Sequence, residues 1–203
     1  MGTPCRMKGI ARFRDLVTRS RSCTGFEPDQ KIAKEELVAL VELACYVPFR
    51  DNRQPLRYIA VSDAGLMQGV TGCFSFDETL PGCSPGVDIG LPSACIILLG
   101  ETGEIKDAVA CQSGIAAQTI LLGAHAAGYA ALLCEPQDPL RMVDLLDVSA
   151  VYVPLLAIML GSSRETVVID AVSSTVPLAP YLDKHGIRHV PKLAVEEVLL
   201  KIC

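Results

Sequence analysis

The sequence predicts an α+β fold, in which helices flank a central sheet of mostly antiparallel or mixed strands. Two helical patterns come before the first strand pattern, and strands and helices then alternate only imperfectly. That order fits a sandwich better than a doubly wound parallel fold. No G-x-G-x-x-G motif follows a strand pattern, so the dinucleotide-binding fingerprint is missing as well. With 203 residues the chain can bury a sizeable core, and we expect a single domain over residues 1–203.

The first third of the chain is expected to form two helices and a strand. Residues 8–21 and 34–47 carry apolar side chains at helical spacing, and Pro48 ends the second helix. A polar loop follows at residues 50–55. Residues 56–61 (LRYIAV) favour extended structure, which predicts the first strand of the sheet.

The rest of the chain supplies the other strands and the longest helix. Residues 71–92 are rich in Gly, Pro, Ser and Asp, which indicates a long, mobile insertion. Residues 94–99 (ACIILL) form a short, fully apolar run, which is typical of a buried strand. Residues 104–127 predict a long central helix. The remaining expected elements are strands at 130–134 and 153–160, a helix at 138–146, and a C-terminal extension at 181–203.

Mean hydropathy is +0.37, which indicates either a membrane segment or a large surface buried against a partner. The stretch from Gln112 to Cys134 holds no charged side chain and is long enough to cross a bilayer. However, it contains polar side chains and several glycines, and neither a Lys/Arg cluster nor an aromatic belt flanks it. We therefore expect this small-residue helix to be buried in a tight interface, and we expect no membrane association.

Charge is unevenly distributed along the chain. The first 22 residues carry a net charge of +5, so the remainder carries −10 of the total of −5. A basic N-terminus can be a transit peptide, a nucleic-acid-binding arm, or an amphipathic helix followed by an anion site. The helical spacing of the apolar residues in 8–21 favours the amphipathic helix. The acidic remainder argues against nucleic-acid binding.

Cysteine and histidine usage indicates a reduced protein without a metal centre. The chain has nine cysteines, an odd number, and no C-x-x-C motif, which is typical of a cytoplasmic location. His185 and His189 are four residues apart, but Gly186 lies between them and no third ligand is evident. No P-loop motif is present, so the sequence gives no nucleotide-hydrolysing signature.

Four segments, in order, resemble motifs of one enzyme family. They are residues 20–26 (SRSCTGF), residues 48–58 (PFRDNRQPLRY), residues 114–128 and residues 189–192 (HVPK). Together they resemble the nitroreductase-like family of FMN-dependent oxidoreductases. Thr24 stands where that family usually has a second arginine, and Arg19 is a candidate to replace it. Phe49 and Leu56 also depart from the family pattern.

The resemblance implies an FMN-dependent NAD(P)H oxidoreductase that reduces nitroaromatic, quinone or similar electron-poor acceptors by a ping-pong mechanism. It also implies a homodimer with FMN at the subunit interface and a domain-swapped C-terminal extension. The alternative is a non-catalytic flavin- or ligand-binding protein on the same scaffold. Because the flavin carries the chemistry, no catalytic side chain is expected.

The resemblance assigns the cofactor to residues whose chemistry suits a flavin. Arginine, serine and lysine can bind the phosphate dianion, while side-chain amides can bind the ribityl hydroxyls or the edge of the ring. The strand after the long helix would offer main-chain groups. The implied cofactor-binding residues are Arg19, Arg21, Ser22, Asn52, Gln54, Ala131, Leu132, Leu133 and Lys192.

Overall fold

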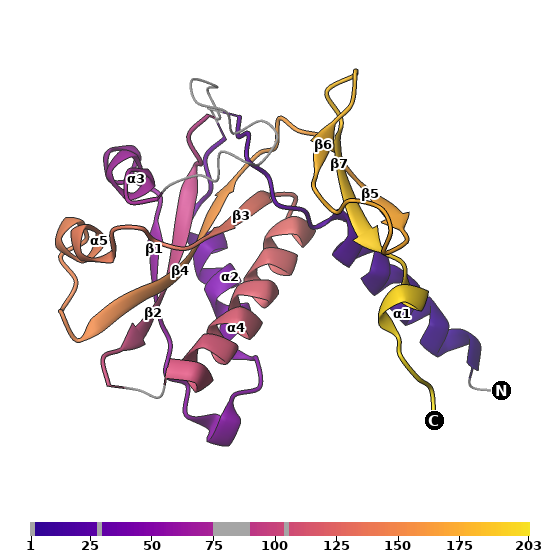
Figure 1. Ribbon diagram of the computed structural model, residues 1–203. Helices are drawn as coiled ribbons and strands as arrows, with labels where there is room; N and C mark the ends of the chain where they lie inside the picture. The colour runs from indigo at the N-terminus through magenta and orange to yellow at the C-terminus, as the bar shows by residue number, and fades with distance from the viewer. Residues whose placement is uncertain (1–2, 28–29, 75–89, 104–105) are drawn as a thin grey trace.

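The structure is a computed structural model that describes residues 3–27, 30–74, 90–103 and 106–203. At its centre lies a four-stranded antiparallel sheet in the order β1-β2-β4-β3 (Figure 1). Its strands are β1 (Arg57–Val61), β2 (Ala94–Glu101), β3 (Ala130–Cys134) and β4 (Tyr152–Gly161). Helices cover both faces of this sheet, which confirms the predicted α+β class.

Each face of the central sheet packs against its own pair of helices. The pairs are α2 (Lys34–Cys45) with α4 (Lys106–Ala126), and α3 (Ala64–Thr71) with α5 (Pro139–Leu145) (Figure 1). Because side chains alternate along a strand, Ile96 of β2 joins the core under α2 and α4. Its neighbour Ile97 joins the core under α3 and α5. A strand covered on both faces must be apolar at every position, which explains why residues 94–99 are all apolar.

The small residues of α4 are used within the chain. Ala116, Ala117 and Ala124 are fully buried in the core shared with α2. At Gly123, a Cβ atom would press against the side-chain end of Leu43, so the glycine eases the close approach of α2 to α4. These residues therefore pack α4 against α2 within the chain. The expected burial of this helix between two subunits stays a prediction. In the described part of the chain, no helix is long and apolar enough to cross a membrane.

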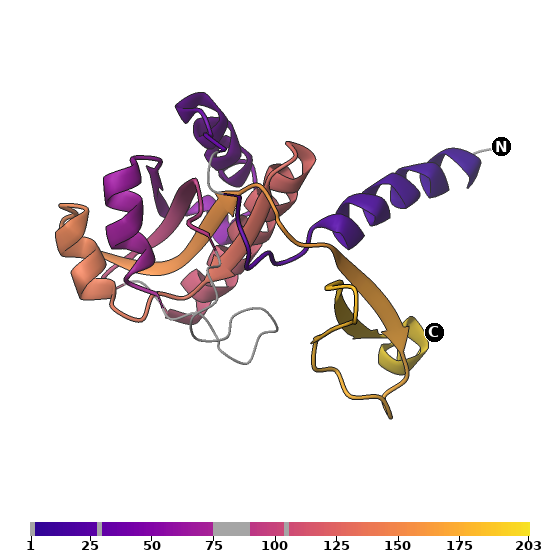
Figure 2. The same cartoon turned by 90° about the horizontal axis from the view of Figure 1, so that it is seen from above.

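A second, smaller sheet follows the central one in the sequence. Its order is β5-β7-β6, with β5 and β7 parallel and β6 antiparallel to β7. With α1 (Thr3–Arg19), this sheet projects away from the central body (Figure 2). The strands are β5 (Val167–Val172), β6 (Tyr181–Leu182) and β7 (Arg188–Leu193), and α6 (Val195–Val198) follows them.

The projecting parts carry exposed apolar side chains. On α1, Met7, Ile10 and Phe13 are 53–59% exposed. Near the C-terminus, Leu200 and Ile202 are 97% and 84% exposed. Large apolar side chains this exposed are candidates for an interaction surface.

Several local expectations need correction. The first helix ends at Arg19, so Arg21 lies beyond it, and the loop at 50–55 begins with a short 3₁₀ turn at Arg50–Asn52. Helix α3 and strands β5, β6 and β7 were not predicted. Helix α3 is short and contains two glycines, but Asp63 caps it by accepting a hydrogen bond from Leu66 N. Most of the expected insertion at 71–92 lies outside the described residues.

Candidate functional site

The segment after α1 runs across the ends of the central strands. Cys23 N donates a hydrogen bond to Ala131 O at 3.0 Å, and Ser22 forms a parallel bridge with Ala131 of β3. Phe26 forms an antiparallel bridge with Ser163, just beyond β4, and its side chain is 1% exposed. The buried Phe26 ring anchors the segment, so that Arg21 and Ser22 are held beside β3.

Arg21 is fixed by the end of the helix that precedes it. Its Nε donates to Ser20 O at 2.6 Å, and its Nη2 donates to Val17 O at 2.9 Å. These bonds satisfy carbonyl groups that a helix end leaves without partners. Burial lowers the pKa of Arg21 from its ordinary value. The guanidinium is therefore a cation with little freedom to move.

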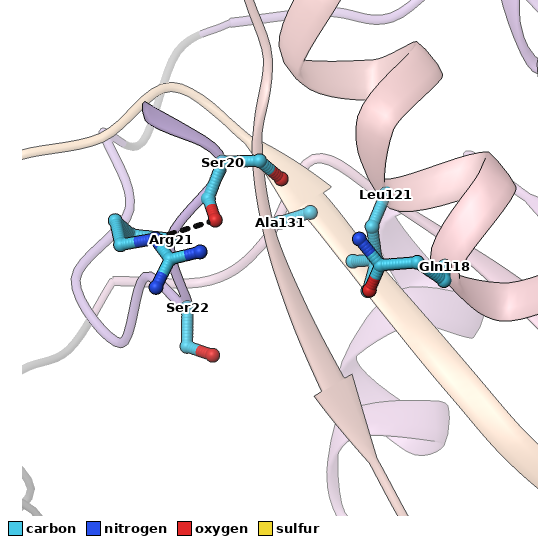
Figure 3. A pocket seen from close by; sticks show the side chains of 6 residues that line it. All are labelled: Ser20, Arg21, Ser22, Gln118, Leu121 and Ala131. Atoms are coloured by element: carbon cyan, nitrogen blue, oxygen red, sulfur yellow. Dashed lines mark hydrogen bonds between the residues drawn. The ribbon is translucent and has the colours of Figure 1, made fainter. Parts of the chain in front are cut away.

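Arg21 lines three cavities. The first, of about 150 Å³, is lined by Ser20, Arg21, Ser22, Gln118, Leu121 and Ala131. In Figure 3 the Gln118 amide points from α4 toward the Ser20–Ser22 segment, with Ala131 of β3 between them. Gln118 was not among the predicted site residues, and it adds an amide donor and acceptor to this side of the site.

The second cavity, of about 250 Å³, lies between β3 and the small C-terminal sheet. It brings together five predicted residues from three separate segments of the sequence, and Arg188 adds a third cation to Arg21 and Lys192. The residues lining it are Arg21, Ser22, Leu132, Leu133, Val167, Pro180, Arg188, Val190 and Lys192. Of these described lining residues, none is acidic, so the cavity suits an anion.

Arg19 and the amide-bearing loop lie elsewhere. Arg19 is exposed, donates to Asp15 at 2.9 Å, and lines a different cavity with Arg21 and His125. Gln54 lines a separate cavity of about 330 Å³. Asn52 and Gln54 have positive φ angles of 51° and 47°, an uncommon conformation for residues other than glycine. Within one chain, neither amide lines the cavity that contains Arg21 and Lys192.

Comparisons with known proteins identify the fold. No family model matches the chain, and no curated protein matches it either. Solved structures do match. A nitroreductase family protein from Clostridium novyi NT is 17% identical with a TM-score of 0.64, and the match covers 75% of this chain and 85% of that one. The FMN-dependent nitroreductase from Clostridium difficile R20291 is 18% identical with a TM-score of 0.63, covering 79% and 91%.

The chain has the nitroreductase fold. A further solved structure with this fold is CLA-ER, an enone reductase of gut-bacterial fatty acid saturation metabolism. It is 17% identical to this chain with a TM-score of 0.64, and the match covers 79% of this chain and 92% of that one. The family resemblance seen in the four sequence segments is therefore matched by the fold.

One buried side chain of the candidate site was not singled out from the sequence. Arg188, at the start of β7, is 4% exposed. Its Nη2 lies 2.6 Å from Glu165 Oε1 and donates a hydrogen bond to Thr24 Oγ1. A signal was present in the sequence: Arg188, Val190 and Lys192 alternate along one strand, which places them on one face. All three line the same cavity.

His189 lies between two carboxylates of the small sheet. His189 contacts Asp170 and Asp183. Over residues 3–27, 30–74, 90–103 and 106–203, no group of three or more His, Cys, Asp or Glu side chains could hold a metal ion. His189 therefore takes part in ion pairs of the small sheet.

Proposed function

We propose that this chain is an FMN-dependent NAD(P)H oxidoreductase that reduces nitroaromatic, quinone or similar electron-poor acceptors by a ping-pong mechanism. The observation that carries the proposal is the cavity in which Arg21, Ser22 and Lys192 meet beside β3. A phosphate dianion needs fixed cations and short donors, and these three residues supply both. One protein with a similar structure is named as an FMN-dependent nitroreductase, and another as an enone reductase.

The residues of the cavity fit the phosphate end of the cofactor. Its volume of about 250 Å³ is below the range usual for a complete ligand site, so it suits a part of the nucleotide. The rest of the flavin would then lie along β3, where Ala131, Leu132 and Leu133 follow one another. Leu133 is 41% exposed and can offer an apolar contact to the ring.

We propose further that the complete site needs two copies of the chain. Asn52 and Gln54 lie outside the cavity of their own chain, so in a homodimer they would reach the flavin bound by the other copy. The exposed apolar residues of α1 and of the C-terminal tail offer surface for such an interface, including a swapped C-terminal extension.

In this proposal the protein binds and orients, and the cofactor supplies the redox chemistry. When bound, the flavin would accept a hydride from NAD(P)H and pass electrons to the acceptor. Arg21 and Lys192 would hold the phosphate, and their positive charge would favour a negatively charged reduced cofactor. No side chain of the protein is assigned a covalent or proton-transfer role.

The cytoplasmic location stays a prediction. Cys23, Cys45, Cys73, Cys95, Cys111 and Cys203 are free thiols in the described part of the chain. Free thiols agree with a reducing compartment.

A visible absorption spectrum tests the proposal directly. The purified chain, incubated with FMN and passed over a desalting column, should retain the yellow colour of a flavoprotein. It should then consume NADH or NADPH in the presence of a nitroaromatic or quinone acceptor. A chain that cannot be reconstituted with FMN contradicts the proposal. Stable flavin binding without NAD(P)H consumption would favour the non-catalytic flavin-binding protein.

A further inference from the structure

We propose that Arg188 is a third anion ligand of the cavity that contains Arg21 and Lys192, and that Glu165 and Thr24 position it. The inference deepens the proposed function, because the anion would be the phosphate of the flavin nucleotide. In the nitroreductase-like family a second arginine usually stands where this chain has Thr24. We propose that Arg188, rather than Arg19, takes the place of that arginine.

The first argument is that the guanidinium of Arg188 is buried but incompletely bonded. Its Nη2 has two acceptors, the carboxylate of Glu165 at 2.6 Å and the hydroxyl of Thr24. Its Nε is buried and has no hydrogen-bond partner in the described part of the chain. A buried charged donor without an acceptor destabilises the folded state, so a further negative charge close to this guanidinium is favourable. Arg188 also lines the cavity, where an anion would supply that charge.

The second argument is the position of Arg188 on its strand. Arg188 N donates to Thr166 O at 2.9 Å, which fixes the start of β7. From there the alternation of the strand points Arg188, Val190 and Lys192 to the cavity. Arg21, from the segment after α1, lines the same cavity. An anion bound there would meet cations from both the N-terminal and the C-terminal segment.

The third argument concerns Thr24, which is 1% exposed. Its hydroxyl donates to Glu165 Oε1 at 2.6 Å and accepts from Arg188, and its backbone N–H lies 3.3 Å from Glu165 Oε2. A long cationic side chain at position 24 would compete for this space. Threonine instead holds Glu165 and Arg188 in place, so that the cation comes from β7.

The experiment measures phosphate-dependent binding with the full chain. Wild type and Arg188→Met are titrated with FMN and with riboflavin, which lacks the phosphate. We expect Arg188→Met to weaken FMN binding about tenfold or more, because a charge-assisted hydrogen bond is lost, and to leave riboflavin binding unchanged. Equal FMN binding by both proteins, or an equal loss for FMN and riboflavin, would overturn the inference.

Inorganic phosphate separates this inference from the proposed function. Millimolar phosphate should raise the Tm of the wild type and should raise that of Arg188→Met less. If the wild type responds to phosphate but does not bind FMN, the flavin proposal fails and the role of Arg188 stands. If phosphate shifts both proteins equally or shifts neither, Arg188 is not an anion ligand.

Two variants complete the test. Glu165→Gln keeps the volume and an acceptor oxygen but removes the negative charge beside Arg188, so phosphate should bind more tightly even if Arg188→Met does not fold. Weaker or unchanged phosphate binding would overturn the inference. Arg164→Met is the matched control, since Arg164 lies 3.4 Å from Glu27 in a second arginine–glutamate pair and lines none of the cavities described. It should bind phosphate as the wild type does.

Discussion

The Nδ1 atom of His189 lies 2.8 Å from Oδ2 of Asp170, across the parallel pair β5 and β7. His189 Nε2 also lies 3.6 Å from Asp183 Oδ2, and the ring of Tyr181 stacks on the imidazole at a centroid distance of 4.8 Å. This cluster links all three strands of the small sheet. The sheet in turn carries Arg188 and Lys192 to the candidate site.

The first prediction is that the small sheet is more stable at acidic than at alkaline pH. The hydrogen bond with Asp170, followed by the charges of Asp170 and Asp183, raises the pKa of His189 above its ordinary value of 6.5. A raised folded-state pKa contributes stability that is fully present below about pH 6.5 and is lost as the pH rises through the raised value. Amide hydrogen exchange of β7 should therefore speed up, beyond its intrinsic pH dependence, across that range. His189→Gln should abolish this extra dependence, and a wild type without it would contradict the assignment.

A second prediction concerns Lys192. Lys192→Gln removes one cation from the cavity and should weaken FMN binding about tenfold, in line with the loss of a charge-assisted hydrogen bond. Fluorescence titration measures the change, and riboflavin binding should not respond. Lys201→Gln, at an exposed position of the tail, is the control and should bind both ligands normally. If both variants behave alike, Lys192 does not contact the phosphate.

Complementation between two defective variants tests the shared site. Asn52→Gly removes the amide while tolerating the positive φ of 51°, and Lys192→Gln damages the other half of the site. If each site draws on two chains, random exchange of subunits should restore about a quarter of the sites, because half of the dimers are mixed and each mixed dimer has one intact site. Flavin retention measures the recovery. No recovery after exchange would place Asn52 outside the site of the other chain.

The last prediction addresses the core of the central sheet. Met159 of β4 is completely buried, so Met159→Ala should lower the free energy of unfolding by about 2–5 kcal/mol. Val153 lies on the same strand but is 40% exposed, and Val153→Ala should cost less than about 1 kcal/mol. Urea denaturation compares the two. A similar cost for both would mean that β4 is not buried as described.

Local sequence patterns were enough to predict most of the central body. Continuous apolar runs predicted β2 and β4, because a strand buried on both faces is apolar at successive positions. Helical spacing of apolar residues predicted α2 and α4, because a helix buried on one face repeats its apolar residues every three or four positions. Helix α3 and strands β5, β6 and β7 were not predicted, because they are only partly buried and their apolar pattern is weak. Strand β5 also depends on parallel pairing with β7, a contact between distant segments that no local pattern records.

For the candidate site too, some features could be read from the sequence and others only from the tertiary structure. The sequence by itself singled out Arg21, Ser22 and Lys192, from their motifs, as candidates for the phosphate end of the proposed site. Only the tertiary structure decided that these residues share one cavity, that Asn52 lies outside it, and that Arg188 belongs to it. The contacts that hold Arg188 join residues 164 and 23 positions apart in the chain. Hydrogen bonds of a buried charge depend on which side chains folding brings together, and that information is absent from any one segment.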